Sequence, residues 1–79
     1  MNLKVYPNPA AKEIVVESVD FAYDKIEIVD LNGKKVFSES VVYEPRKVLQ
    51  VNLNDGVYFL QFSDDKLFHQ EKLVIVNKL

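Results

Sequence analysis

Alternating apolar and polar residues dominate this chain, and they predict strands rather than helices. The strongest strand candidate is the run at 57–62, which follows a turn signal and is rich in β-branched and aromatic residues. Alternation places Tyr58, Leu60 and Phe62 on one face of this strand. The opposite face is mostly apolar as well, so we expect a central strand with a neighbour on each side.

Six further segments carry a similar pattern. We predict strands at 3–6, 12–18, 25–30, 34–38, 47–53 and 67–76. The segment Ser40–Pro45 is a weaker candidate, in which Val41 and Tyr43 could form a short edge strand that the proline ends. The last segment contains a continuous apolar run from Leu73 to Val76, which is typical of a strand covered on both faces.

A tight hairpin is predicted where a strand ends in Asp-Leu-Asn-Gly. A two-residue type I′ turn would place the Asn-Gly pair at its centre. A type I turn that begins at Asp30, with Gly33 in the left-handed region as a bulge, also fits. We favour the second geometry because it sets Asp30 opposite Lys34. It also sets Ile28 opposite Val36, which matches like with like.

Turn signals recur about every ten residues, and no segment shows apolar residues at helical spacing. We therefore predict an all-β fold in a single domain, residues 1–79: a small antiparallel immunoglobulin-like β-sandwich of about seven strands. Gly56 is expected to have a positive φ or to sit in a tight approach at its turn. The expected buried core consists of Ile14, Val16, Ile28, Val36, Leu49, Val51, Tyr58, Leu60, Leu73 and Ile75.

Two segments between strands have open interpretations. Pro7, Asn8 and Pro9 must end a strand ladder, because proline fixes φ and lacks an N–H donor. We interpret them as delivering the chain to the first full strand, with a recognition or processing feature as the alternative. The connection after Ser18 carries Phe21 and Tyr23. One of these is expected to plug an end of the core, with an exposed aromatic binding platform as the alternative.

Composition and charge are consistent with one small domain that has no disulfide bonds. Ten basic residues are interleaved with twelve acidic ones, for a net charge of −2, which argues against a nucleic-acid or anionic-membrane partner. The chain has no cysteine, which suggests the cytosol or a domain stable without disulfides. No apolar run approaches a membrane span, so we expect no membrane insertion. Met1 opens no signal peptide, so we expect a cytosolic protein or a domain excised from a larger exported one.

Groups that could carry chemistry are sparse. His69 is the only histidine, and without cysteine the usual metal and Cys–His arrangements lack parts. No serine has a nucleophile-elbow context, and both glycines are assigned to turns rather than to a phosphate loop. The acidic pair at 64–65 is interpreted as a solvated turn, and the Asp-x-Asn-Gly turn lacks the further ligands of a calcium loop. We expect no enzymatic activity, no cofactor and no metal site.

Three motifs and a terminal strand follow one another along the chain. They are Tyr6-Pro7-Asn8-Pro9-Ala10, Asp30-Leu31-Asn32-Gly33-Lys34-Lys35-Val36 and Leu53-Asn54-Asp55-Gly56-Val57-Tyr58-Phe59-Leu60, followed by Lys72-Leu73-Val74-Ile75-Val76 and Lys78. Each motif alone is a generic β-turn signature. In this order and spacing they resemble the type A C-terminal sorting domain of the type IX secretion system, over essentially the whole chain.

This resemblance implies a delivery role. Such domains lie at the C-terminus of large exported proteins and are read in the periplasm by the outer-membrane translocon. A surface sortase typically removes them, and the cargo stays on the cell surface or is released. The implied partners are therefore translocon and sortase components and an N-terminal cargo domain. The implied destination is the outer membrane or cell surface, reached through the periplasm.

We predict that the translocon reads the last strand and the tail behind it. The candidate residues are Lys72, Leu73, Val74, Ile75, Val76 and Lys78. The translocon component that recognises the signal could add a strand along a free edge of the sheet, or it could bind the basic tail. The alternative function, from another class, is an adhesive or carbohydrate-binding module of a cell-surface protein. Aromatics exposed in a planar row would favour it, whereas burial of Tyr58, Phe59 and Phe62 would count against it.

Overall fold

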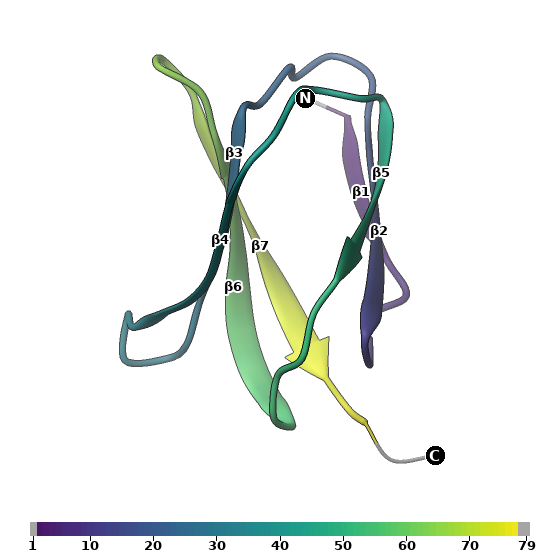
Figure 1. The fold of residues 1–79 in the computed structure, drawn as a ribbon, viewed down its shortest axis with the longest axis vertical. Coiled ribbons are helices and arrows are strands. Elements are labelled where there is room, and N and C mark those ends of the chain that lie inside the picture. Colours follow the sequence, from purple (N-terminus) through teal and green to yellow (C-terminus); the bar gives the residue numbers. More distant parts are fainter. Residues whose placement is uncertain (1, 78–79) are drawn as a thin grey trace.

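The computed structural model describes residues 2–77, which form two antiparallel sheets packed face to face (Figure 1). One sheet has the order β1-β2-β5, with β1 at Leu3–Tyr6, β2 at Glu13–Ser18 and β5 at Arg46–Gln50. The other has the order β4-β3-β6-β7, with β4 at Lys35–Ser40, β3 at Lys25–Val29, β6 at Gly56–Ser63 and β7 at Phe68–Ile75. This confirms the predicted all-β sandwich, with β6 as a central strand. The described residues contain no helix that could cross a membrane.

The segment between β4 and β5 differs from the prediction, because residues 41–45 form no strand. They cross from one sheet to the other and bind the end of β2. The Tyr43 hydroxyl donates a hydrogen bond to the Ser18 carbonyl, and the Ser18 amide donates to the Pro45 carbonyl at 2.9 Å. A connection that changes sheets has no neighbouring strand to pair with, so an alternating pattern is not enough to make it a strand. For the same reason β5 ends at Gln50, short of its predicted limit.

Nine of the ten predicted core residues are buried, and Val36 is half-buried. The hairpin between β3 and β4 explains the exception. Gly33 has φ +82°, and the Gly33 amide donates to the Asp30 carbonyl at 3.0 Å, so the favoured turn is confirmed. The predicted partner of Ile28 is wrong, however. Ile28 lies opposite Phe37, because Val36 is the extra residue of a β-bulge.

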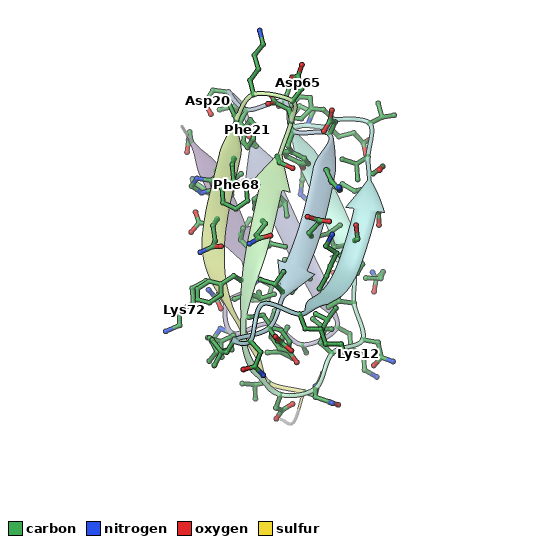
Figure 2. The ribbon with its side chains drawn as sticks, turned by 90° about the vertical axis from the view of Figure 1, so that its left-hand side faces the viewer. Lys12, Asp20, Phe21, Asp65, Phe68 and Lys72 are labelled. Carbon is green, nitrogen blue, oxygen red and sulfur yellow. The ribbon has the colours of Figure 1, made fainter. Side chains whose placement is uncertain are left out.

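Four aromatic rings close the upper end of the core. Phe21 and Tyr23 are both buried, and their ring centroids lie 6.0 Å apart, edge to face. Tyr23 also contacts the rings of Tyr43 at 5.7 Å and Phe62 at 5.2 Å. The predicted plug is therefore confirmed, and it uses both residues of the connection. Figure 2 shows Phe21 inside this end of the sandwich, below the exposed Asp20.

Gly56 does not have the predicted positive φ. It begins β6, and a Cβ added there would lie 3.6 Å from Cε1 of Tyr58, which is an ordinary contact. The expectation fails because the chain reaches β6 from the other sheet through an open crossover, so no tight turn requires a left-handed residue. The crossover is held instead by the Tyr58 hydroxyl, which donates to the Asn54 carbonyl at 2.7 Å.

Candidate functional site

The predicted sorting strand lies at the edge of the larger sheet, where β6 is the one neighbouring strand of β7 among residues 2–77. Leu73 and Ile75 point into the core and are buried. Lys72 and Val74 lie on the outer face, and Val76 follows the strand with 40% of its surface exposed. The apolar run at 73–76 was predicted to be covered on both faces. That prediction is wrong, because the strand has one buried face and one half-exposed face.

The outer edge of β7 is occupied by a segment from the other end of the chain, Asn8–Ala10, which we call the clasp. Ala10 forms a parallel bridge with Ile75. The Ala10 amide donates to the Val74 carbonyl at 2.8 Å, and the Val76 amide donates to the Ala10 carbonyl at 2.8 Å. The lower part of β7 is therefore paired on both of its edges, with β6 on one side and the clasp on the other.

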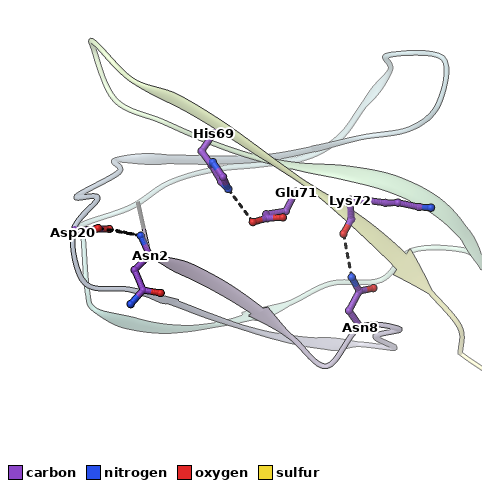
Figure 3. Close-up of polar contacts among 6 residues, drawn as sticks. All are labelled: Asn2, Asn8, Asp20, His69, Glu71 and Lys72. Atoms are coloured by element: carbon purple, nitrogen blue, oxygen red, sulfur yellow. Dashed lines mark hydrogen bonds and ion pairs between the residues drawn. The ribbon is translucent and has the colours of Figure 1, made fainter.

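The side chain of Asn8 extends this pairing by two further hydrogen bonds. Its Nδ2 donates to the Lys72 carbonyl at 3.1 Å, as Figure 3 shows, and its Oδ1 accepts from the Val74 amide at 3.0 Å. Pro7 and Pro9 on either side have no N–H to offer. Asn8 therefore contributes through its carboxamide, which carries both a donor and an acceptor.

The upper part of the same edge is open. The Val74 amide and carbonyl both bond the clasp, and alternate residues of a strand direct their backbone groups to the same side. The N–H and C=O of Phe68 and Gln70 therefore face away from β6. Within residues 2–77 no strand lies on that side. Phe68 is 61% exposed, so the open part carries an exposed aromatic side chain (Figure 2).

The tail behind β7 is anchored as far as Asn77. Its amide donates to Asp55 Oδ1 at 3.0 Å, and its Nδ2 donates to the Leu53 carbonyl and to Asp55 Oδ1, both at 2.8 Å. Both acceptors lie in the crossover before β6, so Asn77 ties the end of the chain to the lower end of the sandwich. Lys78, the last candidate of the predicted signal, lies outside the described residues.

Two further polar groups near β7, His69 and Asp64, make contacts within the domain. His69 Nε2 lies 2.9 Å from Glu71 Oε1 on the inward side of β7, near the open part of its edge (Figure 3). The Asp64 carboxylate accepts hydrogen bonds from the Lys66 and Leu67 amides at 2.7 and 2.6 Å, and these bonds lower its pKa. The acidic pair at 64–65 is thus part of a turn, as predicted. In the described part of the chain, no three His, Cys, Asp or Glu residues are grouped so that they could hold a metal ion.

The clasp is the part of the site that sequence reasoning missed. Pro7, Asn8 and Pro9 were predicted to deliver the chain to β2, whereas the hydrogen bonds of Asn8 to the last strand join residues 64 and 66 positions apart. A local signal was nevertheless present. In a tripeptide with prolines on both sides, the asparagine side chain is the only group besides its own backbone that can both donate and accept.

These features define a small immunoglobulin-like β-sandwich whose first loop holds the edge of its last strand. Residues 4–76 match the model of the secretion system C-terminal sorting domain. The chain therefore belongs to this family, the sorting domains of type IX secretion. Membership implies that the domain interacts with type IX secretion machinery and takes part in export to the cell surface or the medium. Among curated proteins no match to the chain is found.

Proposed function

We propose that this domain is a non-catalytic signal that directs a cargo protein, joined ahead of residue 1, through the type IX translocon across the outer membrane. A surface sortase then separates the cargo from the domain, and the cargo stays on the cell surface or is released. The observation that carries this proposal is the family match over residues 4–76, which spans nearly all of the sandwich from β1 to β7.

The arrangement of the two chain ends supports this role. β1 begins at the upper end of the sandwich, where the Asn2 amide donates to the Asp20 carboxylate at 2.8 Å, and β7 ends at the lower end (Figure 1). The longest extent of the domain is 34 Å. A cargo attached ahead of β1 would therefore leave the lower end of β7 accessible to the machinery.

We further propose that the machinery reads side chains and the tail at this end rather than the backbone edge of residues 72–76. The Val74 amide and carbonyl and the Val76 amide are already bonded to the clasp, so strand addition there would have to displace it. Lys72 is exposed and takes part in no ion pair among residues 2–77. An acidic surface on the reader would complement its ammonium group.

The adhesive alternative requires aromatic side chains exposed in a planar row. Tyr58 and Phe62 are buried, and Phe59 is half-buried. The central strand therefore offers no such platform, which favours the sorting function.

The test is to fuse the domain to a signal-peptide-bearing reporter in a host with a working type IX system. Shortening after Val76 would remove the three hydrogen bonds of Asn77, so the informative cut is after Asn77. We expect this shortened domain to melt like the full domain and to export less reporter. Equal export by the full and the shortened domain would show that the tail is not part of the signal. If the full domain exports nothing while another type IX sorting domain does, the proposed function is wrong.

A charge variant tests the strand itself. We expect Lys72→Gln to lower export without changing the melting temperature. Lys66→Gln is the matched control, because Lys66 is also an exposed lysine but lies in the β6–β7 turn at the opposite end. Equal export by the two variants would exclude Lys72 from recognition.

A further inference from the structure

The carboxamide of Asn8 occupies the position that a backbone peptide group would take in a parallel ladder. Ala10 pairs with Ile75 by donating to the Val74 carbonyl and accepting from the Val76 amide. In a regular parallel strand, the residue two positions before Ala10 would donate to the Lys72 carbonyl and accept from the Val74 amide. The Asn8 side chain makes these two bonds, at 3.1 and 3.0 Å.

This substitution is specific to the chemistry of a short primary amide. The flanking prolines have no N–H group and no polar side-chain atom, so they add no donor to this edge. Aspartate at position 8 would keep an acceptor for the Val74 amide but would have no donor for the Lys72 carbonyl. Alanine would have neither group. The clasp therefore depends on the side chain of one residue to continue the pairing beyond Ala10.

We propose that Asn8 is a positioning residue for the sorting signal, an inference that rests on the function proposed above. Through its side chain, the clasp fixes the main chain of Lys72–Val76 against β6. It also closes this part of the β7 edge to strand pairing and leaves only the Phe68–Gln70 part open. The motif near the start of the domain thereby sets the conformation of the strand at its end.

Hydrogen exchange measured by NMR tests the clasp directly. The Val74 and Val76 amides point to the clasp, whereas the Leu73 and Ile75 amides point to β6. In Asn8→Ala we expect exchange at Val74 and Val76 to accelerate on the order of tenfold, with Leu73 and Ile75 unchanged.

The matched control for exchange is Asn52→Ala. Asn52 is exposed in the crossover before β6, and its side chain has no hydrogen bond to the described residues. We expect this variant to exchange like the unmodified domain at all four amides. Unchanged rates at Val74 and Val76 in Asn8→Ala would overturn the clasp. Equal acceleration at all four amides would also overturn it, because Asn8 would then act only through global stability.

The reporter assay tests whether positioning matters for export. We expect Asn8→Ala to lower export several-fold. The comparison is Val36→Ala, at the bulge of β4 on the opposite edge of the sheet, at an assay temperature where both variants are equally folded. Equal export by the two variants would show a merely structural role and overturn the inference. If the unmodified domain does not export, the proposed function fails, while the exchange pattern still decides whether the clasp exists.

Discussion

Replacing Tyr23 with Phe should stabilise this domain, although Tyr23 is completely buried. Its ring packs against Phe21, Tyr43 and Phe62, and all of these contacts would remain in the variant. Its hydroxyl is also buried, and among the described residues it has no hydrogen-bond partner. The substitution therefore removes an unsatisfied polar group and keeps the apolar packing.

The expected gain follows from the cost of that hydroxyl. Burying a polar group without a partner costs about 1–3 kcal/mol. The small void that the missing oxygen leaves is itself destabilising and offsets part of this gain. We therefore expect the free energy of unfolding to rise by about 1 kcal/mol. In a domain of 79 residues, this corresponds to a melting temperature about 4–8 °C higher.

Urea and thermal unfolding followed by circular dichroism would measure this gain. Tyr43→Phe is the matched control, because the Tyr43 hydroxyl donates to the Ser18 carbonyl. Losing that bond should destabilise the domain by about 1 kcal/mol. If Tyr23→Phe destabilises the domain as much as the control does, the Tyr23 hydroxyl is hydrogen-bonded in solution and the reasoning is refuted.

The same burial predicts a response to alkaline pH. Burial raises the pKa of Tyr23 above its ordinary value of 10.0, with smaller contributions from Tyr43 and Glu44. The folded state then holds the phenolic proton more tightly than the unfolded state does. This contribution is complete below pH 10 and is lost as the pH rises through the raised pKa. Above pH 10, the free energy of unfolding should therefore fall less steeply with pH in Tyr23→Phe than in the unmodified domain.

Three further predictions concern stability. Leu60→Ala should lower the free energy of unfolding by about 2–5 kcal/mol in urea titrations, because Leu60 is fully buried in the central strand. A small effect would contradict the placement of Leu60 in the core. Gly33→Ala should cost about 1–2 kcal/mol because of its φ of +82°, whereas Gly56→Ala should be close to neutral, and equal effects would contradict this contrast. The hydrogen bond from Lys35 at 2.7 Å lowers the pKa of Glu27 below 4.5. Glu27→Gln should therefore lose less stability than the unmodified domain as the pH falls below 4.5, and an equal loss in both proteins would contradict this.

Much of the fold could be predicted because a strand with one buried face has a period of two residues. Tyr58, Leu60 and Phe62 lie on one face as expected from their alternation, and all three are buried. Most of the errors lie where the chain changes sheets or adds a residue. Val36 falls in a bulge and Gly56 follows a crossover, and neither event changes the local alternation of apolar residues. These features depend on which strands become neighbours, which the local pattern does not specify.

The candidate site was predictable as a strand but not as a surface. The run at 73–76 identified an apolar terminal strand, and Leu73 and Ile75 are buried as predicted. Its position at the sheet edge depends on the order of four strands. The occupant of that edge depends on one side chain, Asn8, that bonds main-chain atoms more than sixty residues away. No propensity or periodicity encodes such a contact.

The end of β7 is held on three sides, and this constrains how a reader can recognise it. β6 pairs with its inner edge, the clasp pairs with its outer edge, and Asn77 ties the following tail to Asp55. A partner that bound this segment as an extended peptide would first have to break these bonds, and that cost would be subtracted from its affinity. A partner that bound the side chains of Lys72 and Val76 on the folded domain would avoid it. If the type IX machinery binds this strand, as we propose, these contacts favour recognition of the folded domain, in which the strand is already ordered.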